Sequence, residues 1–143
     1  TTIVVGAGST IAHRCQIMDS NHHFVVNIKQ KLIAKNAKPI YIGKHTWICN
    51  SSTLTGGVKV PDYSIVGSNS LVNKDFSEEG GTCLIAGIPA RPIAKGVFRI
   101  YDQAKENMLI NYFEHNDMPY SFTDKDEQSL IMEWGGGMHT NLS

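Results

Sequence analysis

A strict six-residue repeat of aliphatic side chains dominates the middle of this chain. The repeat runs without a miss through Ile42, Ile48, Leu54, Val60, Val66 and Val72. Four positions after each of the first five aliphatic residues comes a small or β-branched residue: Thr46, Ser52, Val58, Ser64 and Ser70. An α-helix repeats about every 3.6 residues and an exposed strand every two, so neither explains a period of six. This period is typical of a hexapeptide β-helix, in which short strands turn regular corners around a narrow apolar core.

The same repeat occurs upstream and is interrupted once. Val5, Ile11 and Ile17 are six residues apart, but the next aliphatic residue of the repeat, Ile42, follows only after 25. Because 25 is one more than a multiple of six, the intervening stretch must leave the stack of coils.

We therefore expect residues 1–18 to form about one coil, residues 19–39 to form an ejected loop, and residues 40–75 to form two further coils. A loop beside a rigid scaffold is a common place for functional residues. A stack this short has little core for its surface and exposes its end coils, so we expect it to rely on neighbouring subunits.

The pattern changes after residue 75. Residues 76–83 are predicted to form a turn, and residues 84–95 (LIAGIPARPIAK) a final partial coil. Apolar residues at spacings near three and four predict an amphipathic helix over residues 98–113. Residues 127–134 are predicted to form a short helix, and the glycines at 135–137 to begin a flexible tail.

Composition narrows the functional classes. The 143 residues suit one domain, and a formal net charge of zero argues against nucleic acid as a partner. No apolar run approaches the roughly 18 residues of a membrane span, and no secretory signal is visible.

The three cysteines are odd in number and widely spaced, which favours small buried side chains in a reducing compartment and hence a cytoplasmic location. The chain begins without a methionine, so we expect either a removed start or a fragment.

These repeats, together with the motifs KPIYIGKHTWIC, IVGSNSLVNKD and AGIPARPI, resemble the hexapeptide-repeat acyltransferase superfamily, and most closely its sugar and xenobiotic O-acetyltransferases. The resemblance covers residues 1–95 and leaves residues 96–143 as a C-terminal extension, helical and then flexible. It implies an all-β fold: a left-handed parallel β-helix, triangular in section and assembled as a homotrimer. The handedness comes from the resemblance alone, because the general rule for parallel crossovers favours a right-handed connection.

The resemblance implies transfer of an acetyl group from acetyl-CoA to a hydroxyl of a sugar or glycan precursor. A histidine in the loop would act as general base, for which its pKa near neutrality is suited. Two adjacent histidines compete for this role. The stretch Asp-Ser-Asn-His-His from Asp19 resembles the family pattern Asp-x-Asp-x-His and selects His23, whereas alignment from Asn21 selects His22. Adjacent side chains on an extended loop point in opposite directions, so only one can face a given cleft.

The resemblance also implies binding residues. Asp19, Asn21 and Trp47 are candidates for the acceptor site, although Asp and Asn also stabilise turns with their own side chains. The candidates for contacts to coenzyme A are Asn50, Gly67, Ser68, Asn73, Lys74 and Arg91, with Lys95 as a weaker one. Cations are expected there because coenzyme A carries several phosphate charges. Cys49 replaces a glycine of the family pattern Trp-Ile-Gly, which is a departure at that corner.

Other interpretations of the same prism remain open. The γ-type carbonic anhydrases bind zinc through histidines, two of them five positions apart, but Met18 stands five after His13 and Asn50 five after His45, so we expect no metal. His13 and His45 occupy outward positions of their hexapeptides and are predicted to be surface groups. A structural or regulatory prism without catalysis, or an N-acetyltransferase that acts on an amino sugar, would fit the repeats as well.

Overall fold

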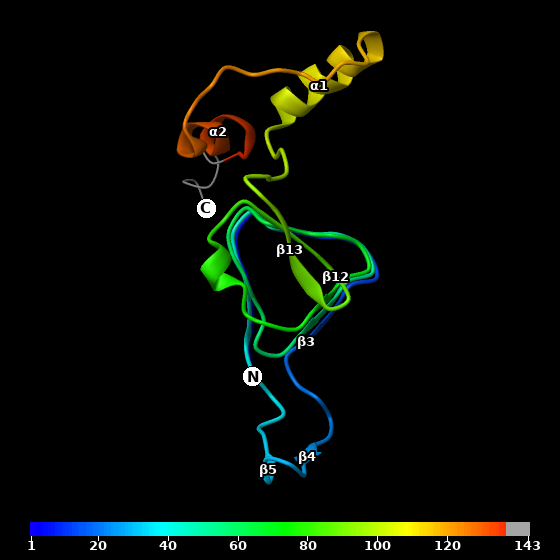
Figure 1. The fold of residues 1–143 in the computed structure, drawn as a ribbon. Coiled ribbons are helices and arrows are strands. Elements are labelled where there is room, and N and C mark those ends of the chain that lie inside the picture. Colours follow the sequence, from blue (N-terminus) through cyan, green and yellow to red (C-terminus); the bar gives the residue numbers. More distant parts are fainter. Residues whose placement is uncertain (137–143) are drawn as a thin grey trace.

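A computed structural model describes residues 1–136, and short parallel strands wound around a triangular core make up most of it (Figure 1). The first face contains β1 (Ile3–Val5), β6 (Ile40–Ile42) and β9 (Lys59–Val60). The second face contains β2 (Thr10–Ile11), β7 (Trp47–Ile48), β10 (Ile65–Val66), β12 (Cys83–Gly87) and β13 (Ala90–Lys95). The third face contains β3 (Gln16–Met18), β8 (Thr53–Thr55) and β11 (Leu71–Val72).

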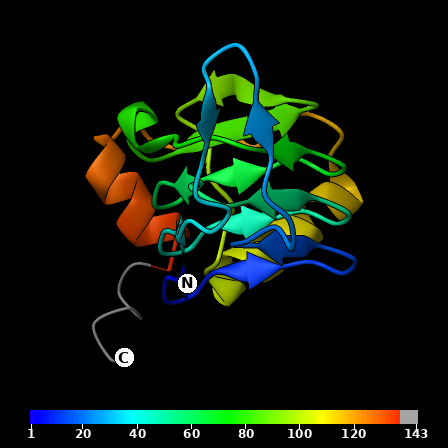
Figure 2. The ribbon, with the colours of Figure 1, turned by 90° about the horizontal axis from the view of Figure 1, so that it is seen from below.

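The strand register confirms that three hexapeptides make one coil. Ile48 pairs in parallel with Val66 on the second face, and Leu54 pairs in parallel with Val72 on the third. The aliphatic residues of the repeat therefore stack on one another along the axis. Figure 2, turned by 90°, shows the coils as layers.

The core lies along this axis and is closed by small polar residues at the corners. The aliphatic side chains from Ile42 to Val72 are at most 3% exposed, and each such burial stabilises the fold by roughly 1.5–3 kcal/mol. The Ser52 and Ser70 hydroxyls both donate to the carbonyl oxygen of Gly67, at 2.9 and 2.7 Å. A larger side chain would not fit at these inward positions, which explains the small residues of the repeat.

The three corners are named here by the faces that they join. The first corner joins the first and second faces and contains residues 6–8, 43–45 and 61–63. The second corner joins the second and third faces and contains residues 12–14, 49–51 and 67–69. The third corner follows the third face and contains Asp19, residues 56–57 and residues 73–74.

Residues 19–39 leave the prism at the third corner as a protruding hairpin (Figures 1 and 2). Its strands, β4 (Val26–Asn27) and β5 (Leu32–Ile33), pair antiparallel. The backbone amide of Lys38 donates to the carbonyl oxygen of Asp19 at 2.8 Å and closes the base of the loop.

The last coil differs from the prediction. We expected residues 84–95 to form a partial coil, but only β12 continues the parallel face, and β13 folds back antiparallel over it. This hairpin closes one end of the stack, and a short 3₁₀ helix, η1 (Ser77–Glu79), precedes it.

The extension contains two helices, α1 (Gln103–His115) and α2 (Glu127–Trp134). The second matches the prediction, whereas the first begins five residues later than expected because the Asp102 side chain caps it by accepting from the Lys105 amide at 2.9 Å. Neither helix of residues 1–136 is long and apolar enough to cross a membrane.

The prediction of a flexible tail at residues 135–137 is wrong for the two glycines that the structure describes. Gly135 and Gly136 are buried, and a Cβ atom on Gly135 would lie 3.1 Å from the Tyr63 ring. Gly137 lies outside the described residues. The end of α2 is thus packed against the first corner of the prism.

Candidate functional site

The two candidate bases lie on the outgoing leg of the loop. His22 and His23 are exposed and follow Asn21, whose backbone amide donates to the carbonyl oxygen of Asn36 at 2.9 Å. Further out, Val26 pairs with Ile33. The two legs therefore fix the position of the histidines on an arm that extends from the third corner.

Asp19 and Asn21 form backbone hydrogen bonds at the base of this arm. The Asn21 carbonyl accepts from the Asn36 side-chain amide at 2.7 Å, in addition to the backbone bond between the same two residues. A Cβ atom on Gly56 would lie 3.0 Å from the carbonyl oxygen of Asp19, so the missing side chain makes room for the loop. The backbones of both residues set the direction of the arm.

Trp47 lies on the second face, which is the side of the triangle opposite the third corner (Figure 1). The extension covers it: the Arg99 guanidinium carbon lies 5.2 Å from the centre of the Trp47 ring. Within one chain the structure therefore does not bring Trp47 together with the loop histidines.

The six candidates for coenzyme A contacts fall into two groups. Asn50, Gly67 and Ser68 stack at the second corner, where the Ser68 hydroxyl donates to the Asn50 side-chain oxygen at 2.8 Å. Arg91 belongs to the same side, because it pairs with Ala86, and a Cβ atom on Gly67 would lie 2.9 Å from the Cβ of Ala86. This contact also explains the glycine, which lets two coils approach closely.

Asn73 and Lys74 lie instead at the third corner, where the loop emerges. Both are exposed, and the Lys74 ammonium lies 5.2 Å from the centre of the Phe76 ring. Lys95, the weaker candidate, donates to the carbonyl oxygens of Glu79 and Gly81. Its ammonium is therefore used within the chain, whereas the Lys74 ammonium forms no ion pair among residues 1–136.

Cys49, which replaces the family glycine, is a structural residue in this chain. The Cys15 thiol donates to the carbonyl oxygen of Cys49 at 3.2 Å, and both side chains are half-buried. Burial raises the pKa of the Cys49 thiol. The group is therefore protonated near neutral pH and is a poor nucleophile.

The prediction that His45 is a surface group is wrong. Its side chain is only 7% exposed and stacks on the Tyr63 ring with 5.0 Å between centroids. Neither ring nitrogen has a hydrogen-bond partner among residues 1–136, and burial lowers the pKa of the imidazole. The spacing could have revealed part of this contact, because His45 and Tyr63 are 18 residues apart, which is one full coil. No sequence pattern indicates that Tyr101 of the extension completes the burial of His45.

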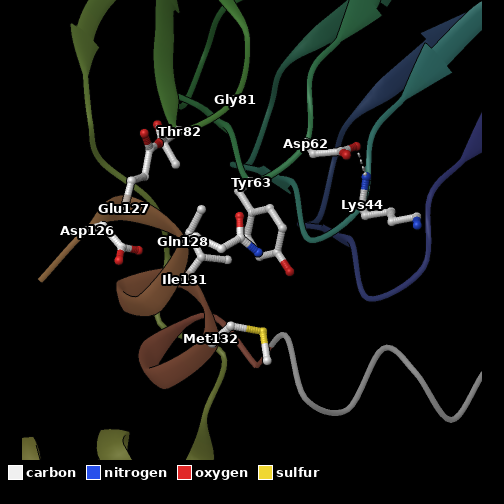
Figure 3. A pocket seen from close by; sticks show the side chains of 10 residues that line it. All are labelled: Lys44, Asp62, Tyr63, Gly81, Thr82, Asp126, Glu127, Gln128, Ile131 and Met132. Atoms are coloured by element: carbon white, nitrogen blue, oxygen red, sulfur yellow. Dashed lines mark hydrogen bonds between the residues drawn. The ribbon is translucent and has the colours of Figure 1, made fainter.

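An open cavity of about 870 Å³ lies between the first corner and α2 (Figure 3). Three carboxylates line it, and each already accepts a hydrogen bond: Asp62 from the Lys44 amide at 2.8 Å, Asp126 from the Ser129 amide at 2.8 Å, and Glu127 from the Thr82 hydroxyl at 2.6 Å. Residues 1–136 contain no cluster of three or more metal-ligating side chains. The cavity is the place where the extension meets the prism, and it contains none of the candidate site residues.

Comparisons with known proteins agree with this architecture. No family model and no curated protein sequence matches the chain. Among solved structures, the polysialic acid O-acetyltransferase OatWY is 25% identical over 78% of this chain, with a TM-score of 0.62. The polysialic acid-specific acetyltransferase NeuO is 25% identical over 99% of this chain, with a TM-score of 0.56. A hexapeptide-repeat acetyltransferase of Vibrio cholerae O1 biovar eltor, in complex with acetyl coenzyme A, is 25% identical over 65%, with a TM-score of 0.54.

The chain spans only part of these proteins: 54% of OatWY, 63% of NeuO and 49% of the Vibrio enzyme. The similarity nevertheless confirms the resemblance to hexapeptide-repeat acetyltransferases that the repeats and motifs indicate.

Proposed function

Starting from this similarity to hexapeptide-repeat acetyltransferases, we propose that the chain is the repeat domain of an acetyl-CoA-dependent O-acetyltransferase that modifies a hydroxyl group of a sugar or glycan. The observation that carries the proposal is the single break in the repeat, which places two exposed histidines on a protruding arm. The neighbours support the reaction class, since two of them are polysialic acid acetyltransferases and a third is complexed with acetyl coenzyme A.

The chemistry needs one base and no covalent enzyme intermediate. The imidazole of His23 takes the proton from the acceptor hydroxyl as its oxygen attacks the thioester carbonyl of acetyl-CoA. The new C–O bond forms, the C–S bond breaks, and the coenzyme A thiolate leaves with the electron pair. The proton then passes from the imidazolium to this thiolate. A histidine is suited to both steps because its pKa lies near neutrality.

The proposed coenzyme A contacts run along the coils. Asn50, Gly67 and Ser68 offer polar groups at the second corner, and Arg91 adds a positive charge at the closed end of the same side. Lys74 belongs to the third corner. A coenzyme A molecule lying in a groove between two copies of the chain can meet both corners, one from each copy, which fits the proposed homotrimer of left-handed prisms.

The loop itself supports assembly with further copies. It exposes Phe24, Val25, Val26 and Ile28, which are 66%, 72%, 63% and 84% accessible. Isolated apolar residues on a surface are normal, but a contiguous exposed group of this kind marks an interface. We propose that this arm packs on a neighbouring copy and brings its histidine to that copy's second face, which carries Trp47.

Acetyl transfer and coenzyme A binding test the proposal separately. The protein is incubated with acetyl-CoA and a panel of hydroxylated and aminated acceptors, and His22→Gln and His23→Gln are compared with His115→Gln, at an exposed histidine that ends α1. We expect His23→Gln to reduce transfer by about 10²–10⁴ while coenzyme A affinity is unchanged. Full activity in both loop variants would refute the base assignment, and no coenzyme A binding by the unmodified protein would refute the function.

A further inference from the structure

Arg99 reaches from the extension over the outer side of the second face. Its guanidinium carbon lies 5.2 Å from the centre of the Trp47 ring and 4.7 Å from that of Tyr101, both within the range of cation–π interactions. Its Nη1 donates to the Thr10 hydroxyl at 2.9 Å. Two aromatic rings and one hydroxyl therefore fix the orientation of this guanidinium.

The segment that carries Arg99 is itself held firmly. The backbone amides of Tyr101 and Asp102 donate to the carbonyl oxygen of Trp134 at 3.0 and 3.2 Å. The Tyr101 ring meets the buried His45 ring, with centroids 5.2 Å apart. The packing of the extension against the prism therefore sets the position of Arg99, which does not lie on a free surface loop.

This half-buried cation has no acidic partner. Within residues 1–136 no carboxylate forms an ion pair with Arg99, and only one hydrogen bond from its guanidinium is present. A guanidinium has five N–H donors in a planar fork that matches carboxylate and phosphate groups. Partial burial of a charge without a counter-charge is unfavourable, so a fixed and unpaired arginine beside a candidate site residue indicates that an anion completes it.

Resting on the proposed function, we propose that Arg99 is a specificity residue of the acceptor or cofactor site that binds an oxyanion next to Trp47. The oxyanion is either the carboxylate of an acidic sugar acceptor or a phosphate of acetyl-CoA. In both cases the extension contributes a residue directly to the site.

The charge of the loop also favours an anionic ligand. It contains four lysines, Lys29, Lys31, Lys35 and Lys38, against the single carboxylate of Asp19, and all four are exposed. Among residues 1–136 none of these lysines forms an ion pair. The arm that carries the candidate bases is therefore positively charged, as a site for an anionic substrate requires.

A binding experiment tests Arg99 without any turnover. In a Trp134→Phe background the remaining tryptophan is Trp47, whose emission reports directly on the guanidinium beside it. The probes are tri-galacturonate, the neutral galactotriose and coenzyme A, each at low and at high salt. Arg99→Met removes the charge but keeps a flexible apolar side chain between the two rings, and Lys44→Met, which removes an exposed charge at the first corner, is the matched control.

We expect Arg99→Met to weaken binding of one anionic probe by roughly tenfold, with no change in Lys44→Met. Loss of tri-galacturonate binding alone identifies an acceptor carboxylate, and loss of coenzyme A binding alone identifies a phosphate. Arg99→Lys should restore only part of the affinity, because an ammonium cannot make the paired contacts of a guanidinium.

Unchanged affinity for both anionic probes would refute the proposal, as would an equal loss for galactotriose, which would mean that Arg99 only packs against Trp47. If Arg99→Met fails to fold, Thr10→Ala removes the oriented hydroxyl and should weaken the same probe, whereas unchanged affinity there would count against the site. Failure of the proposed function is recognised separately, as absence of acetyl transfer by the unmodified protein.

Discussion

The ring of His45, from the first corner of the prism, meets the ring of Tyr101, from the extension, at 66° with centroids 5.2 Å apart. Tyr63 stacks on the imidazole from the next coil, at 18° and 5.0 Å. The imidazole is therefore enclosed between the prism and the extension, and its charge state affects how well the two parts fit together.

This contact predicts a stability that depends on pH. Burial lowers the pKa of His45 below its ordinary value of 6.5, with an opposing effect from Asp62 and a smaller lowering by Lys44. When the extension undocks, the imidazole regains its ordinary pKa, so the undocked state takes up the proton first. Docking is therefore fully stable well above pH 6.5 and weakens as the pH falls below it.

Hydrogen exchange of residues 98–102 and 127–136, corrected for intrinsic rates, measures the effect. We expect protection to fall by up to about tenfold per pH unit below pH 6.5. His45→Phe keeps a ring but cannot be protonated, so the same pH dependence in that variant would contradict the explanation.

Gly8 makes room for the buried imidazole. A Cβ atom there would lie 2.4 Å from Cε1 and 2.5 Å from Nδ1 of His45, and the backbone φ is +73°. We expect Gly8→Ala to reduce the free energy of unfolding by about 2–3 kcal/mol, because it adds a clash to the cost of a left-handed alanine. Gly96→Ala is the control, since its φ is +77° and nothing lies within 4 Å. Equal losses in urea denaturation would show that the clash is relieved without cost.

The repeat and the loop could be predicted because they depend on local spacing. In a prism with 18 residues per coil, each core residue stacks on the residue 18 positions further along the chain, so both must be apolar. Ile48 and Val66 meet this condition. One extra residue between Ile17 and Ile42 was enough to reveal the loop. The short helix at residues 127–134 was likewise visible in its own sequence and is confirmed.

The contacts of the extension could not be predicted, because they join residues far apart in the sequence. Arg99 bonds to Thr10 across 89 positions, and no spacing rule relates the two. The return of β13 over β12 was missed because its aliphatic residues continue the apolar character of the repeat. The burial of His45 was missed for the same reason as the Arg99 contact, since its cover comes from Tyr101.

The aliphatic side chains of the prism are buried to different extents, which predicts that shortening them lowers the free energy of unfolding by different amounts. Leu54 is fully buried, whereas Ile11 in the first coil is 39% exposed. Leu54→Ala should reduce the free energy of unfolding by about 2–5 kcal/mol, because it leaves a cavity between two coils that cannot collapse. Ile11→Ala should cost about 1 kcal/mol, since its side chain is already partly hydrated. Urea denaturation of both variants at one protein concentration measures the difference, and similar losses would argue against a core centred on the later coils.

The hydrogen bond from Thr82 to Glu127 predicts a local effect on α2. Thr82 is 1% exposed and its hydroxyl donates to the carboxylate at 2.6 Å. Thr82→Val keeps the volume and the β-branched shape, so the left-handed backbone at φ +50° costs the same in both proteins. Because the carboxylate of Glu127 is exposed and can be hydrated, we expect a loss of only about 1 kcal/mol.

This loss should appear as faster hydrogen exchange in α2, whose first residue is Glu127, while the amides of β7 and β10 on the second face keep their protection. Thr53→Val, at a half-buried threonine of β8, is the matched control and should leave α2 unchanged. Faster exchange throughout the prism in Thr82→Val would mean that the first corner, and with it the coils, depends on the docked helix. Unchanged exchange in α2 would mean that the close packing at Gly135, where an added Cβ atom would lie 3.1 Å from Tyr63 and 3.4 Å from Phe98, holds the helix without the hydrogen bond.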